Sequence, residues 1–216
     1  MRHRTRSRSR EGAIRSFACV AIAGAMLLTS GCTVIAGQQA RTAAETRLAQ
    51  TITETQGAVW DHRDALAADV DGAVDAMLAG GVSPITDARR VAAGTAIEVG
   101  SGEAALLGTD ASPRNAVLTF TVVDAGKAGD YLTSTTRTEG LCFALRPPVD
   151  EAVIITEDAA CPSSRGLPVA DNSNDGQTVD LVPLARLDVR TTVSASDFRP
   201  PPCQCYSGSS CECPGG

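Results

Sequence analysis

The fold is decided by one stretch of sequence, Asn115-Ala-Val-Leu-Thr-Phe-Thr-Val-Val123. Its apolar side chains Leu118, Phe120 and Val122 alternate with Thr119, Thr121 and Val123. A period of two residues is typical of a strand that buries one face, because successive side chains point to opposite sides of a sheet. The stretch therefore predicts a strand that packs one face on a core.

The pattern continues towards the C-terminus as further strands. The segments we expect are a turn at 125–130, strands at 133–146 and 152–156, a surface loop at 162–177 and a fourth strand at 178–193 that is interrupted at Pro183. In the second strand Leu141, Phe143 and Leu145 face one way, and after Pro147-Pro148 we place Arg146 opposite Ala152. Strands joined by short turns favour an antiparallel sheet.

Towards the N-terminus the period changes to that of a helix over residues 36–80. Apolar residues recur at steps of three, four or seven, namely Leu48, Ile52, Val59, Leu66, Val70, Ala73 and Met77. We expect a break near Gln56-Gly57, a stop at Gly80-Gly81, and a second helix from Ser83-Pro84 to about Ala93. The predicted fold is α+β: a long N-terminal helix, broken or whole, packed on a small antiparallel sheet of three or four strands.

Charge is divided unevenly along the 216 residues. Six of the 19 basic residues are arginines within the first fifteen positions, whereas the chain from Cys32 onward has 13 basic and 24 acidic residues. An acidic body is repelled by nucleic acid, so no nucleic-acid partner is expected. The low aromatic content, 3%, predicts an aliphatic core.

The N-terminus has the layout of an export signal. The arginines are followed by twelve uncharged, mostly apolar residues, Phe17 to Leu28, and then by Thr29-Ser30-Gly31-Cys32. Small residues just before a cysteine at the end of an apolar run resemble the lipobox of bacterial lipoproteins. That resemblance implies removal of residues 1–31 and a diacylglyceryl group on Cys32, with residues 32–36 as the lipid-anchored N-terminus.

Two other outcomes stay open for this segment. Cleavage after Ala36 would release the protein, and no cleavage would leave Phe17 to Ala36 as a short membrane anchor. All three outcomes place the body on the extracytoplasmic side, because the arginines stay inside. The single Lys127 beside eighteen arginines is similar to actinobacterial lipoproteins, and the helix-plus-sheet architecture resembles that of pilins, although the apolar run here ends before Cys32.

Six cysteines remain beyond Cys19 and Cys32. Cys142 and Cys161 bracket the hairpin at Pro147-Pro148, and in an exported protein we expect them to form a disulfide worth about 3 kcal/mol. The other four form a C-x-C-x5-C-x-C cluster after three prolines: Cys203, Cys205, Cys211 and Cys213. We interpret this tail, residues 200–216, as disulfide-stapled or partly disordered. The alternatives are a Zn²⁺ or Cu⁺ site on the same four thiolates, and free thiols or links between chains.

No constellation in the sequence predicts an enzyme. His62 lies on the apolar stripe, so we expect a packed or rim histidine and no Ser-His-Asp arrangement. A glycine pattern similar to the dinucleotide-binding motif occurs at Gly100-Ser101-Gly102-Glu103-Ala104-Ala105, but the sequence after it is too short for the helix that the motif needs. A pattern similar to a calcium-binding loop occurs at Asp171 to Gly176, but it lacks the final glutamate ligand. We therefore expect no catalytic residue, no cofactor and no resident metal.

The functional expectation is a lipoprotein at the cell membrane, on its extracytoplasmic face, with an α+β domain over residues 37–199. Its partners are the membrane, through the lipid anchor, and a protein of the cell envelope for which it acts as a binding or structural module. The alternative is a metal-handling protein that uses the C-terminal cysteine cluster.

Overall fold

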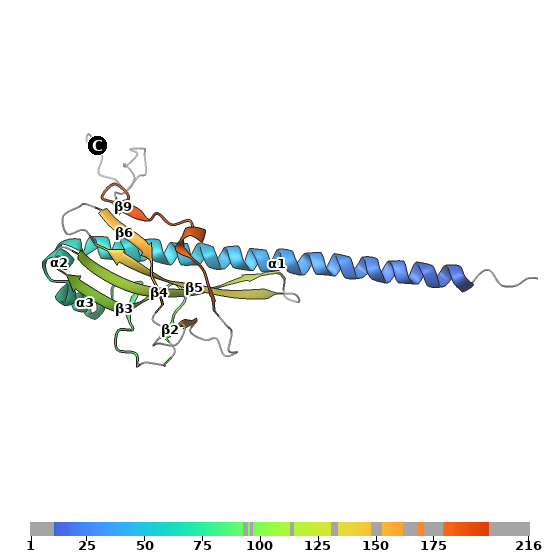
Figure 1. The fold of residues 1–216 in the computed structure, drawn as a ribbon, viewed down its shortest axis with the longest axis horizontal. Helices are drawn as coiled ribbons and strands as arrows, with labels where there is room; N and C mark the ends of the chain where they lie inside the picture. Colours follow the sequence, from blue (N-terminus) through green and yellow to red (C-terminus); the bar gives the residue numbers. More distant parts are fainter. Residues whose placement is uncertain are drawn as a thin grey trace, which may run out of the picture.

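The computed structural model describes residues 11–92, 95, 97–112, 115–130, 134–147, 153–161, 168–170 and 179–198. In the first helix it describes side chains from Val34 onward. A long helix lies across one face of a twisted sheet and projects beyond it at its N-terminal end (Figure 1).

Three helices form the N-terminal part: α1 (Glu11–Asp61), α2 (Arg63–Ala68) and α3 (Val70–Ala79). The predicted apolar stripe is confirmed, because its members are buried apart from Val70, which is half-buried. The predicted stop is also confirmed, since Gly81 has a φ of 64°, a conformation that favours glycine.

The predicted break near Gln56-Gly57 is wrong, because the helix breaks later, at His62 and Asp69. Gly57 stays helical, and a Cβ atom there would lie 3.7 Å from the ring of Phe198. Asp69 has extended backbone and its carboxylate accepts a hydrogen bond from the Gly72 amide at 3.1 Å, which starts α3 as an N-cap.

The main sheet has seven strands in the order β1-β3-β4-β5-β6-β9, with β8 paired to β5 beside that path. Their bounds are β1 (Ile85–Asp87), β3 (Ala104–Ser112), β4 (Asn115–Ala128), β5 (Thr135–Arg146), β6 (Val153–Asp158), β8 (Asp180–Leu181) and β9 (Thr192–Ser194). A separate parallel pair joins β2 (Ile97–Val99) to β7 (Pro168–Ala170), and a 3-10 turn, η1, spans Leu184–Arg186.

The predicted small antiparallel sheet of three or four strands is therefore wrong, although helix and sheet do pack together. The sheet is mixed, since β1 pairs β3 and β8 pairs β5 in parallel. Strand β3 was not predicted because its register shifts between Leu106 and Gly108, which interrupts the two-residue period. The predicted fourth strand is divided into β8, η1 and β9.

Two other segments also differ from expectation. Residues 125–128 continue β4, because Gly126 pairs with Arg137 in the β4–β5 ladder where a turn was predicted. Residues 85–87 form β1, paired with residues 104–106, where a second helix was predicted. The Ser83-Pro84 peptide bond that precedes β1 is cis.

The sheet has two unequal buried faces. On the face towards α1, Leu118, Phe120 and Val122 of β4 meet Leu141, Phe143 and Leu145 of β5 beneath the stripe of α1 to α3, as the alternation predicted. Phe120 and Phe143 stack there with ring centroids 5.4 Å apart. The opposite face holds a smaller cluster, made of Ala88, Ile97, Val99, Ala105, Leu107, Val123, Cys142 and Val179.

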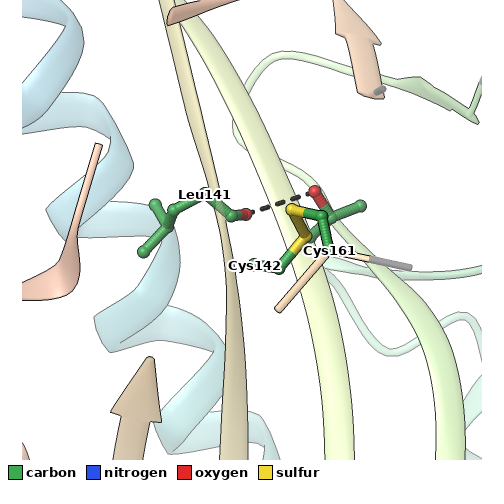
Figure 2. Close-up of a disulfide and its surroundings, with 4 residues drawn as sticks. Leu141, Cys142 and Cys161 are labelled. Atoms are coloured by element: carbon green, nitrogen blue, oxygen red, sulfur yellow. Dashed lines mark hydrogen bonds between the residues drawn. A yellow bond between two sulfur atoms is a disulfide. The ribbon is translucent and has the colours of Figure 1, made fainter. Parts of the chain in front are cut away.

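The predicted disulfide is present on the smaller face. Cys142 and Cys161 are joined with their Cα atoms 5.2 Å apart, and Figure 2 shows the bond on the side of β5 that faces away from α1. The hairpin register differs from the predicted one, since Arg146 lies opposite Ile155 instead of Ala152. That shift of three residues places Ala159 beside Cys142, so Cys161 reaches it directly.

Candidate functional site

A groove runs along α1 where the C-terminal segment 184–198 crosses it. It consists of two adjoining hollows of about 580 and 590 Å³, which share Thr53, Glu54 and Asp188. From Thr42 to Gly57 the α1 wall extends for about 22 Å, at a rise of about 1.5 Å per residue. We call this feature the α1 groove.

The α1 wall of the groove carries polar side chains because it is the face of the helix that the sheet leaves uncovered, while most of the exposed area of the lining comes from apolar atoms. Leu48 and Ile52 point into the core, whereas the neighbouring helical positions Thr46, Gln50 and Thr53 line the groove. The hydroxyls of Thr46 and Thr53 donate to the carbonyls four residues earlier, which leaves their methyl groups and oxygen lone pairs for a ligand.

Buried polar contacts hold the opposite wall in place. Gln56 is 1% exposed and its amide donates to Thr156 Oγ1 at 2.7 Å and to the Arg190 carbonyl at 2.8 Å. At the start of the segment the Leu184 amide donates to Asp158 at 2.7 Å. These bonds join α1, β6 and the C-terminal segment, and so hold the segment against the helix.

One end of the groove carries a charged cluster. Arg186 pairs with Glu45 at the groove surface, and beneath them Glu139 of β5, 1% exposed, accepts a 2.9 Å hydrogen bond from Arg41 Nε. Arg186 lies 4.0 Å from the same Glu139 oxygen, whereas the second oxygen, Oε2, is buried and has no hydrogen-bond partner among the described residues. Burial, and then the neighbouring Glu45 carboxylate, raise the pKa of Glu139, and Arg41 and Arg186 partly oppose that shift.

The other end of the groove is aromatic. Phe198 stacks on Trp60 with ring centroids 5.1 Å apart, and the Arg63 guanidinium lies 4.8 Å from the Trp60 ring. Asp197 turns the chain there, and hydrogen bonds from the Ser194 amide and hydroxyl, helped by Arg190, lower its pKa. A ligand lying along the groove would therefore meet charge at one end and aromatic surface at the other.

The groups that line the groove can form hydrogen bonds with an extended polar chain. Among the described lining residues there is no cysteine or histidine beside the threonine hydroxyls to act as base or nucleophile. His62, expected as a packed or rim histidine, is half-buried at the end of α1, and its Nδ1 lies 2.9 Å from the Ala58 carbonyl. The groove offers hydroxyls, amides and ion pairs, which recognise backbone amides and hydroxyl groups.

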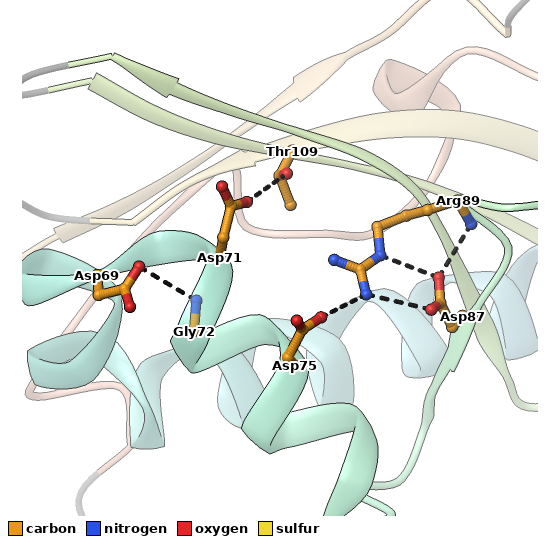
Figure 3. Close-up of polar contacts among 7 residues, drawn as sticks. All are labelled: Asp69, Asp71, Gly72, Asp75, Asp87, Arg89 and Thr109. Carbon is orange, nitrogen blue, oxygen red and sulfur yellow. Dashed lines mark hydrogen bonds and ion pairs between the residues drawn. The ribbon is translucent and has the colours of Figure 1, made fainter.

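A second polar cluster fastens α3 to the sheet edge (Figure 3). Arg89 bonds both oxygens of Asp87 and one oxygen of Asp75, at 2.7–3.1 Å, while Thr109 donates to Asp71 at 2.9 Å. The Arg89 guanidinium lowers the pKa of Asp87. Because each carboxylate has a partner within the chain, we interpret the cluster as a structural clamp between α3, β1 and β3.

The other residues singled out in the sequence have structural or undescribed positions. Gly100 to Gly102 form a tight turn in which Ser101 donates to the buried Asp124 at 3.2 Å, so the dinucleotide-like motif ties a loop to β4. Cys32 lies within α1, where the structure describes its backbone only. The segment from Asp171 to Gly176 and the cysteines at 203, 205, 211 and 213 lie outside the described residues.

The described residues contain neither a membrane-spanning helix nor a metal-binding cluster. No helix among them is long and apolar enough to cross a membrane. The same part of the chain contains no group of three or more His, Cys, Asp or Glu side chains placed to hold a metal ion.

Comparisons with known proteins place the chain in no family, since no family model, no curated protein and no solved structure matches it. The α1 groove was not predicted from the sequence. Its walls come from segments about 140 residues apart, as in the contact of Arg186 with Glu45. The only local signal was the run of threonine and glutamine on the uncovered side of the helical stripe.

Proposed function

We propose that the chain is an exported lipoprotein, held by lipid on Cys32 at the extracytoplasmic face of the cell membrane, and that its α+β domain is a binding module. The observation that carries the anchor is the uncharged run Phe17 to Leu28, which is preceded by arginines and followed by Gly31-Cys32. The continuous helix α1 supports it further, because a chain that begins at Cys32 keeps the whole core-packed part of that helix.

The anchor is tested by removing the thiol. Cys32→Ala should abolish lipidation, because a thioether to diacylglyceryl needs the cysteine sulfur, and the expected readouts are loss of the lipid mass on the N-terminal peptide and altered processing. Cys19→Ala is the matched control, since Cys19 lies inside the apolar run and should leave lipid and processing unchanged. A Cys32→Ala protein that still carries lipid would contradict the anchor.

The binding role rests on the α1 groove. Its length of about 22 Å accommodates roughly six or seven residues of an extended chain at about 3.3 Å each. Hydroxyl, amide and carboxyl groups set in a mainly apolar lining suit a partner that presents both backbone amides and apolar side chains, and we therefore propose a polypeptide segment of a cell-envelope protein as the ligand.

A photo-activatable residue in the groove tests this role. With benzoylphenylalanine in place of Gln50, irradiation of intact cells should produce one discrete protein adduct, and Thr46→Arg in the same chain should reduce it by filling the groove. The control position is Glu98 of β2, which is exposed and lies outside the groove. An adduct pattern that is the same from both positions, or no adduct from Gln50, would contradict a groove ligand.

A further inference from the structure

The end of the β4–β5 hairpin lies beside the middle of α1, around residues 34–44. Gly126 touches the helix so closely that a Cβ atom there would lie 1.8 Å from the Ala40 carbonyl oxygen. Further along, Thr135 and Arg137 share a hollow of about 470 Å³ with Val34, Gly37, Gln38 and Arg41. The hairpin therefore runs along α1 towards its N-terminus (Figure 1).

Simple geometry brings the hairpin end to the level of Cys32. Cys32 precedes Ala40 by eight helical residues, a rise of about 12 Å. At the hairpin end Thr135 lines the same hollow as Val34, which follows Cys32 by two helical residues, a rise of about 3 Å. Whatever anchors the chain at Cys32 therefore holds the hairpin end at the same height.

Unpaired positive charge gathers at this end of an otherwise acidic molecule. Lys127 and Arg137 are exposed and have no carboxylate within 4.0 Å in the described part of the chain, whereas Arg41 is paired with Glu139. Among the other arginines whose side chains are described, Arg90 also has no carboxylate within 4.0 Å, and the rest form ion pairs. Asp130 is the one exposed acidic residue at the described hairpin end, and it has a partner of its own.

Apolar surface lies next to that charge. Val34 and Ile35 are 65% and 59% exposed, the highest values among the large hydrophobic side chains that the structure describes. Exposed aliphatic side chains beside unpaired cations are the combination that binds an anionic bilayer surface, where the charges meet headgroups and the apolar groups meet the acyl boundary.

We propose that this end of the molecule contacts anionic phospholipid headgroups through Val34, Ile35, Lys127 and Arg137. The domain then lies directly against the membrane surface, with α1 extending away from it. The inference rests on the proposed anchor at Cys32 and adds an orientation and a lipid class to it. Each basic residue at an anionic surface contributes roughly fivefold to such binding.

The experiment uses the full protein, purified from membranes and reconstituted in vesicles, with benzoylphenylalanine at one of two exposed positions. Thr136 lies at the hairpin end, and Asp64, whose side chain is 91% exposed, lies just beyond the opposite end of α1. In vesicles of phosphatidylcholine with about a third phosphatidylglycerol, irradiation should attach lipid at Thr136 at least fivefold more than at Asp64. The difference should shrink in pure phosphatidylcholine.

Charge variants and flotation separate the possible failures. Lys127→Glu with Arg137→Glu should lower the lipid adduct at Thr136 at least fivefold, whereas Lys127→Arg with Arg137→Lys should keep it. A protein that does not float with the vesicles overturns the anchor and the orientation together. A protein that floats but gives equal adducts at both positions, or an adduct that is insensitive to lipid charge and to charge reversal, overturns the orientation alone.

Discussion

The two faces of the sheet are stabilised differently, one by an apolar core and the other by a smaller cluster together with a disulfide. The face under α1 to α3 buries a continuous apolar core in which Phe120 and Phe143 stack, and no disulfide is found among its described residues. The opposite face has a small aliphatic cluster, and there the chain is closed by the bond between Cys142 and Cys161. On the smaller face, the disulfide therefore adds loop-closing stability to what a limited apolar cluster supplies by packing.

The largest effect is expected from opening the helix-covered face. Phe143→Ala should lower the free energy of unfolding by about 3–5 kcal/mol, because the ring is fully buried and its neighbours cannot collapse into the cavity. Chemical denaturation of the folded protein measures the change. Leu107→Ala on the opposite face is the comparison, and a loss there equal to that of Phe143→Ala would refute the inequality of the two faces.

Removing the disulfide should come next in size. Cys142→Ala with Cys161→Ala opens a link with a sequence separation of 19 residues, which predicts a loss of about 3 kcal/mol, or roughly 6–12 °C in Tm. Calorimetry measures the shift, and treatment of the unaltered protein with reductant should produce the same one. A double variant as stable as the parent would mean that packing alone closes the smaller face.

A helix cap on the larger face should have a smaller effect. Asp69→Ala removes the carboxylate that accepts from the Gly72 amide, and a loss of about 1 kcal/mol is expected. Asp71→Ala is the matched control on the same helix, with a solvent-exposed bond to Thr109 and an expected loss under about 0.5 kcal/mol. Urea midpoints of the two variants decide between them, and a reversed order would show that α3 does not depend on its cap.

The smallest effect concerns pH and the buried Glu139. A carboxyl whose pKa is raised in the folded state binds more protons there than in the unfolded state, so it favours folding at low pH. That contribution is complete below the ordinary value of 4.5 and is lost as pH rises through the higher folded pKa.

Glu139→Gln should therefore remove this decline in stability above pH 4.5 and flatten the profile of Tm against pH. The matched control is Glu157→Gln, whose side chain is 47% exposed and pairs with Arg146 at the surface. If both variants keep the parent's slope, Glu139 does not carry the pH dependence.

Local periodicity explains which parts of this fold were predictable. The alternation at 118–123 and the stripe from Leu48 to Met77 were predicted because each is set by one face packing on one core. The disulfide was predictable from its place around a hairpin, even though the register was off by three residues.

The elements that were missed depend on contacts distant in sequence. The stretch around Gly126 was predicted to be a turn, yet it is strand, and its glycine is needed because α1 leaves no room for a Cβ atom at Ala40. Strands β1 and β8 are too short to show a period, and their parallel partners are fixed by the folded sheet. The α1 groove likewise arises only when residues 186–198 reach α1, so no local pattern marks it.

The long reach of α1 has a consequence for the order in which the chain acquires structure. The helix is synthesised first, but the residues that its buried side contacts lie about 100 positions later in the sequence. Examples are the hydrogen bonds of Arg41 with Glu139 and of Gln56 with Thr156. Until β4 and β5 have been synthesised, Leu48 and Ile52 are exposed on the apolar side of an isolated amphipathic helix. Contacts between residues this far apart in sequence slow folding and leave apolar surface exposed to aggregation. The nascent chain therefore has most need of a chaperone after α1 has been synthesised and before β5 has been synthesised.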